Sequence, residues 1–357
     1  MENKNNTIKI IVIIAILGVM LLILVNTFIM TGFSIKNNKD LVVGAILPLS
    51  GDYSYIGQEV SRGIKLALDE SYLDIKVIYE DEESFNSIAA INSANKLTNI
   101  DNIDVGLTTM IEVAKPIAPI FNNKKIPLLV VWDSTNFIYE SDNLFSTGFS
   151  TEKSGEKMAE FAFNELKLRK IAVISHKDVW SEIISKAFMN KFVTLGGEIV
   201  IHETYNPDER DYRTALLKIK NKNVDAIYAP LVPPVIADFI TQKRELGIDA
   251  QILAGDSIIQ DVIDASGNAA EGIIFTNIYV ENVNVLKQKY FEKFGEEPID
   301  ITLVSFGYDG LKTIENAYKI NPNNLQQGLV EVIGPSGSLD RVERIYLVKE
   351  GQLVLIN

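Results

Sequence analysis

Short apolar runs alternate with amphipathic segments along most of this chain, and this alternation is what most constrains the fold. In the first half the runs are residues 41–47, 75–81, 103–107 and 126–131. The first of them, LVVGAIL, has the apolar density typical of a strand buried in a parallel sheet. The segments between the runs are predicted to be helices. The series therefore predicts β–α–β units, with helices on both faces of a parallel sheet.

The same pattern starts again in the second half of the chain. Strands are predicted at residues 169–175, 198–203, 225–230 and 251–255, with helices between them. Two sheets of this kind exceed what one hydrophobic core holds, so we expect two α/β lobes. No linker rich in Pro, Gly or Ser separates them, which favours a hinge over a flexible tether. Residues 343–357 are predicted to form a hairpin with a Glu-Gly turn.

The first predicted helix follows the loop SGDYSY and carries its apolar residues on one face. Gly63 lies within this helix and is expected to let it approach the sheet closely. In doubly wound sheets, ligands bind beyond the carboxyl ends of the strands. Tyr53 lies in that place, past the turn and before the helix, so we expect it at the edge of a ligand cleft.

Composition excludes several classes of function. The net charge of −13 argues against a nucleic-acid partner, because phosphate binding favours a basic surface. The absence of Cys excludes disulfides, thiolate metal sites, Cys nucleophiles and lipid attachment at an N-terminal Cys. Phosphate-loop, dinucleotide-binding, zinc-protease and serine-hydrolase motifs are missing, and the chain has only two His residues. We therefore expect no enzyme activity, no cofactor and no metal site.

The N-terminal segment differs from the rest of the chain. Residues 10–35 contain no charged side chain, and the run is long enough to cross the hydrocarbon core of a membrane as a helix. Lys4 and Lys9 precede it, which favours a cytoplasmic location for residues 1–9. We expect a transmembrane anchor followed by a linker at residues 36–40, with the bulk of the chain outside the cytoplasm. A cleaved signal peptide, and hence a secreted protein, is the alternative.

Motifs spread along the chain resemble those of one known family. They are the opening strand and loop with Leu-Ser-Gly, AKPIAPIFNNKKIPLL, IAVISHKDVWSEI, DAIYAP, ELGIDAQILAGDS, AEGIIF, SFGYDGLKTI and the closing GPSGSLD and IYLVKEGQLV. In kind and order they resemble the type I periplasmic binding proteins, in particular the branched-chain amino acid receptors (leucine-binding proteins) of ABC importers. The resemblance covers residues 41–354.

This resemblance implies a Venus-flytrap fold of two doubly wound parallel-sheet lobes joined by a hinge. Lobe one is expected to comprise residues 41–149 and 279–333. Lobe two is expected to comprise residues 150–278 and 334–357. The implied function is an extracytoplasmic solute-binding protein that holds a small polar ligand, an amino acid or a similar solute, between the lobes. Its implied partners are the permease and ATPase subunits of an ABC importer. A ligand sensor acting through a membrane partner is the alternative.

In the family, hydroxyls and backbone N–H groups at two helix starts of lobe one receive the ligand's carboxylate. The matching loops here are GLTTMIE and VVWDSTN, which offer Thr108, Thr109 and Ser134. Helix N-termini carry partial positive charge and free N–H groups, so an anion binds there without an Arg. Simple capping of the helices by Thr109 and Ser134 is the alternative.

The chain departs from the family pattern at several of these positions. Trp132 stands where the family has a small residue, and Asp133 follows it as a possible cation acceptor. Trp180 takes the place of a family Tyr, with core packing as the alternative. Ile56 and Val232 fall near the positions of two further family Tyr residues. The pocket is therefore expected to be bulkier and less polar than in the family, and ligand specificity is not inherited.

Asp256 follows the predicted strand QILAG, at its carboxyl end. In the family this position carries an acid that accepts the ligand's ammonium group. A carboxylate that loses water when a cleft closes needs a cationic partner to offset that cost. The alternative is that Asp256 caps the short helix that follows it.

Overall fold

The computed structural model describes residues 40–357, apart from residues 136, 139–140, 336 and 339–340. The expected cytoplasmic segment (1–9), membrane anchor (10–35) and most of the linker (36–40) therefore lie outside the described residues. Among the residues that the structure does describe, no helix is both long and apolar enough to span a membrane.

The first sheet has five strands in the order β2-β1-β3-β4-β6. Neighbouring pairs β1/β3, β3/β4 and β4/β6 are parallel, with Val43 opposite Val105 and Leu107 opposite Leu129. The predicted strands of this half are confirmed, and β6 is an addition to them. The strands are β1 (Leu41–Leu47), β2 (Ile75–Asp81), β3 (Val105–Thr108), β4 (Leu128–Val130) and β6 (Leu144–Ser146).

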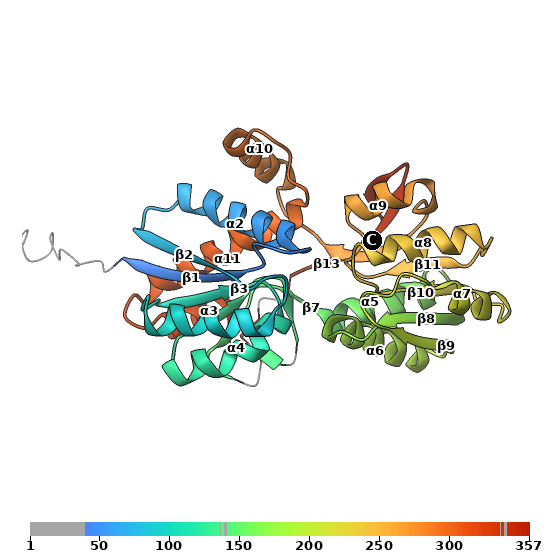
Figure 1. Cartoon of the computed structure of the whole chain (residues 1–357), viewed down its shortest axis with the longest axis horizontal. Coiled ribbons are helices and arrows are strands. Elements are labelled where there is room, and N and C mark those ends of the chain that lie inside the picture. The colour runs from blue at the N-terminus through green and yellow to red at the C-terminus, as the bar shows by residue number, and fades with distance from the viewer. Residues whose placement is uncertain (1–39, 136, 139–140, 336, 339–340) are drawn as a thin grey trace, which may run out of the picture. The chain divides into compact units, whose positions relative to one another are not determined.

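Helices cover both faces of this sheet, as Figure 1 shows. On one face, α3 and α4 pack their apolar residues against Ile46, Leu128 and Val130 of the strands. On the other face lies the pair α2 and α11. The helices of this part are α2 (Ser54–Asp69), α3 (Ser87–Asn99), α4 (Ile111–Lys124), α10 (Val283–Phe294), α11 (Ile301–Ile320) and α12 (Leu325–Ile333).

Helices α2 and α11 contact each other backbone to backbone at two glycines. A Cβ added at Gly63 would lie 2.0 Å from the carbonyl oxygen of Val304, and one at Gly307 would lie 1.9 Å from that of Val60. Neither position has room for a side chain. The close neighbour of Gly63 is therefore α11, not the sheet as the sequence predicts. The periodicity of α2 shows which face is buried, but it does not show which distant segment covers that face.

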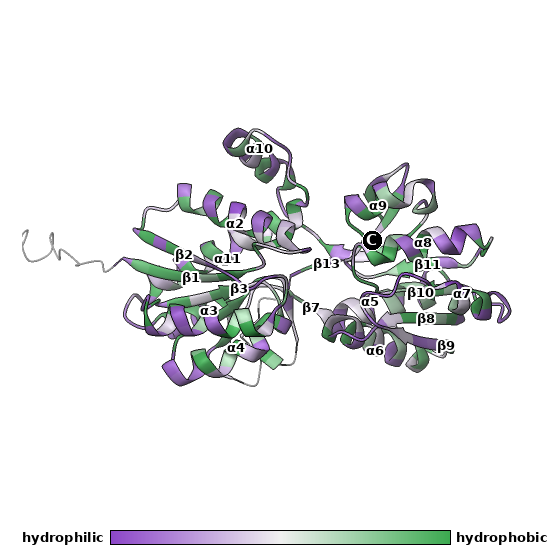
Figure 2. Cartoon of the chain, in the orientation of Figure 1, coloured by the Kyte–Doolittle hydropathy of each residue, from purple (hydrophilic) through white to green (hydrophobic). Residues whose placement is uncertain are grey.

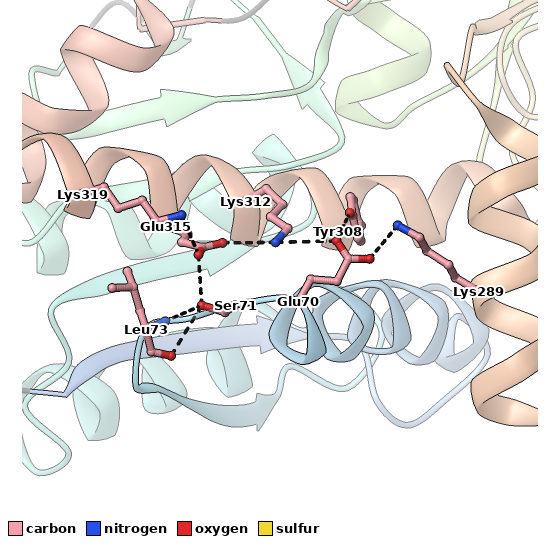
Figure 3. A network of polar contacts seen from close by, with 8 residues as sticks. All are labelled: Glu70, Ser71, Leu73, Lys289, Tyr308, Lys312, Glu315 and Lys319. Carbon is pink, nitrogen blue, oxygen red and sulfur yellow. Dashed lines mark hydrogen bonds and ion pairs between the residues drawn. The ribbon is translucent and has the colours of Figure 1, made fainter.

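Polar contacts join the C-terminal end of α2 to α10 and α11 (Figure 3). The carboxylate of Glu70 lies 2.6 Å from Lys289 Nζ and accepts a 2.6 Å hydrogen bond from Tyr308 OH. The hydroxyl of Ser71 donates to the buried carboxylate of Glu315, which also pairs with lysines of its own helix. Although partial burial opposes it, the hydrogen bonds from Lys289 and Tyr308 lower the pKa of Glu70. The network thus fixes where α2 ends against two helices that come much later in the sequence.

The second sheet has seven strands in the order β14-β13-β12-β11-β10-β8-β9. Strands β9, β8, β10, β11 and β12 pair in parallel, whereas β12/β13 and β13/β14 are antiparallel. Positive φ angles at Glu350 and Gly351 make the tight turn between β13 and β14, so the predicted hairpin is confirmed. The strands are β8 (Lys170–His176), β9 (Glu198–Tyr205), β10 (Ala226–Tyr228), β11 (Gln251–Ala254), β12 (Ile274–Ile278), β13 (Glu343–Lys349) and β14 (Gln352–Leu355).

This sheet also carries a hydrophobic core on each face. Helices α5 and α6 pack on one face, and α7, α8 and α9 pack on the other (Figure 1). Figure 2 shows the interior strand β8 mostly in the hydrophobic colour and the neighbouring edge strand β9 in the hydrophilic one. The helices are α5 (Thr151–Asn164), α6 (Val179–Thr194), α7 (Arg213–Lys220), α8 (Val235–Glu245) and α9 (Gln260–Ser266).

The chain passes between the two sheets more than once. A short parallel pair, β5 (Asp133–Ser134) with β7 (Phe149–Ser150), leads from the first sheet to α5. After β12 the chain returns through α10 to α11, which packs on α2 of the first sheet. After α12 it passes again to β13, which pairs with β12. The result is the two-lobe α/β architecture that the sequence predicts.

Candidate functional site

A cavity of about 250 Å³ is lined by segments that follow strands of both sheets. From the first sheet come the loops after β1, β3 and β4, which supply Tyr53, Glu112 and Trp132. From the second come the segments after β8 and β11, which supply Trp180 and Asp256. Parallel strands present all their carboxyl ends at one edge, which is where doubly wound sheets bind ligands.

Among the five acids that line this cavity, only Asp256 has a buried carboxylate oxygen without a hydrogen-bond partner. Its Oδ2 accepts a hydrogen bond of 3.1 Å from Nε1 of Trp132, while its buried Oδ1 accepts none. Burial raises the pKa of Asp256 to about 6, and the Trp132 hydrogen bond opposes that rise. The indole N–H of Trp180 also lies near enough to lower this pKa, although it forms no hydrogen bond. The helix that follows, α9, begins after Ile259 without a side-chain cap, so Asp256 does not cap it.

Asp133 also lines the cavity and is only 6% exposed. Its Oδ1 accepts a 2.8 Å hydrogen bond from the backbone N–H of Ile111, the first residue of α4. Burial, together with the nearby carboxyls of Glu112 and Asp256, raises the pKa of Asp133 to about 7. The group is thus an N-terminal cap of α4 that is supplied from a different segment of the chain.

Three further carboxyl groups line the cavity, and each accepts a backbone N–H at the start of a helix. Asp178 caps α6 through a 2.8 Å hydrogen bond from the N–H of Ser181. Glu112 accepts a 3.0 Å bond from the N–H of Val179. Asp300 caps α11, where Thr302 donates at 2.8 Å. Burial raises the pKa of all three carboxyl groups.

Aromatic rings form much of the remaining wall. Trp132 stacks on Phe306 with ring centroids 5.6 Å apart, and Tyr53 lies 4.9 Å from Phe85 at a tilted angle. Trp180 lines the cavity and also packs against the core beneath α6. Ile56 and Val232 line the cavity as well. An apolar wall with a few polar groups is typical of a small-molecule site.

The predicted site residues divide into two groups. Five of them line the cavity: Tyr53, Trp132, Asp133, Trp180 and Asp256. The other three lie behind its wall: Thr108, Thr109 and Ser134, which are almost fully buried and are absent from the lining.

The three buried hydroxyls do not cap α4. The side chain of Met110, the residue before that helix, makes no capping hydrogen bond, and the Oγ1 atoms of Thr108 and Thr109 have no hydrogen-bond partner. The hydroxyl of Ser134 accepts a 2.9 Å bond from Ser338. Met110 and Glu112, from the same loop as the two threonines, line the cavity instead.

Sequence reasoning missed Glu112, Asp178 and Asp300. Each lies at or just inside a helix start, where an acid is ordinary and signals only a cap or a favourable helix dipole. Phe306 was missed for a similar reason, because it lies in the apolar face of α11 and has the pattern of a core residue. The available signal was that Asp178 follows β8 directly, at the edge where the other site residues gather.

The raised pKa values predict how stability depends on pH. Asp133 and Asp256 have folded pKa values of about 7 and about 6, both above those of an unfolded chain. Their contribution to stability is therefore full below the unfolded pKa and is lost as the pH rises through the folded pKa. The thermal midpoint of the ligand-free protein is therefore expected to decrease as the pH is raised from about 5 to about 7.5. Asp133→Asn should flatten this slope and stabilise the protein at the higher pH by about 0.5–2 kcal/mol.

Scanning calorimetry at several pH values checks this expectation, with Asp249→Asn as the matched control. Asp249 is exposed, so the same chemical change there should leave the slope as it is in the wild type. Carboxylates with a lowered pKa, such as those of Glu70 and Glu315, make the folded protein more stable as the pH rises, but this effect lies at lower pH. A slope that Asp133→Asn leaves unchanged contradicts the raised pKa of Asp133.

Comparison with known proteins gives one consistent result. The profile of a family described as periplasmic binding protein matches residues 40–321. The Leu/Ile/Val-binding protein homolog 2 of Brucella abortus is 24% identical over 300 residues, which cover 78% of each chain. The resemblance to the branched-chain amino acid receptors is therefore confirmed.

Solved structures agree on the fold. The leucine binding protein LivK from Thermotoga maritima matches with a TM-score of 0.80 and 25% identity, over 89% of this chain and 98% of that one. A solute binding protein of an ABC transporter from R. palustris, solved in complex with benzoate, matches with a TM-score of 0.76 and 20% identity, over 89% and 96%. These proteins are named for what they bind and not as enzymes. Because the family match spans most of its length, the chain belongs to the periplasmic binding proteins.

Proposed function

We propose that this protein is the extracytoplasmic solute-binding component of an ABC importer, and that it binds a small solute bearing an amino group. The observation that carries the proposal is Asp256, a carboxylate with one buried oxygen that accepts no hydrogen bond, facing a cavity with aromatic walls. Such a group needs a cationic partner to offset the loss of water. Family membership supports an extracytoplasmic location and delivery to permease and ATPase subunits.

We assign ligand contact to Tyr53, Trp132, Asp133, Trp180 and Asp256, because all five line the cavity. Thr108, Thr109 and Ser134 are assigned to the loops behind its wall. An amino acid or a similar solute is the family's precedent, since the Brucella relative is named for Leu, Ile and Val. We divide the chain into lobe one, residues 41–149 and 279–333, and lobe two, residues 150–278 and 334–357.

The two tryptophans of the chain give a direct test of binding. The chain has only two Trp residues, and both line the cavity. Tryptophan fluorescence of the folded protein therefore reports on the cavity without background from elsewhere. Titration with amino compounds such as isoleucine should change the emission in a saturable way. If titration with a panel of amino acids and amines gives no saturable change in emission or heat, the proposal fails.

Ligand binding is expected to draw the lobes together. Segments of both lobes line the cavity, and three chain crossings without a flexible linker favour a hinge. Closure is a population shift whose size is limited by the ligand's preference for the closed state. Small-angle X-ray scattering at a ligand concentration that saturates the fluorescence should show a smaller radius of gyration than without ligand. An unchanged radius at saturation contradicts the hinge.

The N-terminal segment is expected to remain attached and to hold the receptor at the membrane. Residues 10–35 are uncharged over a length that can span a membrane, and no Cys is present for lipid attachment. Intact-mass spectrometry of the protein isolated from its own membranes should give the mass of the chain with this segment. A mature chain that begins near residues 34–40 would show a cleaved signal and a freely diffusing receptor.

A further inference from the structure

The charges around the cavity are all of one sign. Among the described residues that line it, five carry carboxyl groups and none is Lys, Arg or His. A ligand carboxylate placed here would meet no positively charged side chain. In such a site the N-terminal ends of helices are the main receivers for an anion, through their free N–H groups and partial positive charge.

Three helix ends at this cavity, those of α4, α6 and α11, are already occupied by the protein's own acids. The first N–H of α4 donates to Asp133, and the N-terminal N–H groups of α6 donate to Asp178 and Glu112. The start of α11 donates to Asp300. Each bond directs the positive end of a helix to a carboxylate of the chain. These ends are therefore not available to a ligand's anion.

The start of α2 is the remaining helix end of the first sheet at the cavity, and it too is largely engaged. The N–H of Tyr53 donates to Ser84 Oγ at 3.0 Å. The N–H groups of Ser54 and Ile56 donate to backbone carbonyls at 3.2 Å and 3.0 Å. The start of α2 is thus engaged by contacts within the protein.

Two oxygen atoms without a hydrogen-bond partner belong to residues that line the cavity, as does the unpaired indole N–H of Trp180. The buried Oδ1 of Asp256 accepts no hydrogen bond. The hydroxyl of Ser257 has no hydrogen-bond partner either. Ser257 is only 6% exposed and lines the same cavity. Both oxygens can accept hydrogen bonds from an ammonium group. The rings of Trp132 and Trp180 supply faces that attract cations.

The acids are spread around the wall and do not converge on one point. Within the part of the chain that the structure describes, no three His, Asp or Glu side chains lie close enough together to hold a metal ion. A distributed ring of acids and aromatic faces suits a larger cation with an apolar body. We propose that the solute is an organic ammonium ion without a carboxylate, an alkylamine or arylalkylamine, and not an amino acid. This inference rests on the proposed function and narrows its ligand class.

Matched pairs of probes test the inference, because each pair differs at the carboxylate. The first pair is isoleucine and its decarboxylated form, 2-methylbutylamine. The second is benzoate and benzylamine, which share a ring and carry opposite charges. Each probe is titrated into the full protein, with tryptophan fluorescence and calorimetry as readouts. Each amine is expected to bind at least about tenfold more tightly than its carboxylate partner, because bringing like charges together is strongly unfavourable.

The outcomes separate this inference from the proposed function. Tighter binding of isoleucine than of 2-methylbutylamine overturns the inference and leaves the proposed function intact. Binding of benzoate but of no amine overturns the inference, and with it the amino group assigned to the solute. If neither amines nor amino acids bind, both proposals fail. Tighter binding of both amines than of their partners supports both.

Discussion

Asp256→Asn is expected to weaken the binding of an ammonium-bearing probe by about 2–4 kcal/mol, the range for breaking a buried charge pair. The probe is isoleucine or 2-methylbutylamine, whichever the wild type binds. Asn keeps an oxygen for the hydrogen bond from Trp132 Nε1 and keeps the size of the side chain. It removes only the negative charge that faces the ammonium group. Isothermal titration calorimetry of the two proteins measures the difference directly.

Two controls make this result specific. Asp249→Asn removes the same charge just before β11, the strand whose other end leads to Asp256, and should leave affinity unchanged. The ligand-free Asp256→Asn protein should be at least as stable as the wild type at neutral pH, because burial raises the pKa of Asp256 and disfavours its charge. Equal affinity of Asp256→Asn and the wild type would show that this carboxylate has no cationic partner.

Gly307→Ala is expected to lower the free energy of unfolding by about 3 kcal/mol or more, at the upper end of the range for overpacking. The added Cβ would lie 1.9 Å from the carbonyl oxygen of Val60, a backbone atom that cannot rotate away. Helices α2 and α11 must therefore separate, and the polar contacts of Glu70 with Tyr308 and Lys289 are strained with them. Urea unfolding of the wild type and the variant gives the difference.

The control for this substitution is Asn316→Ala, an exposed position of the same helix, where the change should be within about 0.5 kcal/mol. Gly63→Ala should resemble Gly307→Ala, since its Cβ would meet the backbone of α11. Once either alanine has forced the helices apart, the second alanine lowers the free energy of unfolding by less. The double variant should therefore lose less stability than the sum of the losses of the two single variants. Wild-type stability of Gly307→Ala would contradict the close contact of the two helices.

The strands were predictable because a buried parallel strand needs apolar residues throughout, as in LVVGAIL and KIAVIS. Trp132 and Asp256 lie two residues after β4 and β11, and Trp180 is the second residue of α6. The family resemblance pointed to all three as site residues, and all three line the cavity. Glu112, Asp178 and Asp300 were not predictable, because an acid at a helix start is also an ordinary cap. Only the folded chain brings these helix starts around one cavity. The helix that packs on Gly63 could not be predicted either, because α11 lies more than two hundred residues further along the chain.

Two hydrogen bonds join loops that follow strands of different sheets: Trp132 to Asp256, and Val179 to Glu112. Both need only protein atoms. They favour the closed arrangement in part of the empty molecules. The solute then supplies less free energy for closure, and it binds more tightly than it would to a receptor without these two bonds.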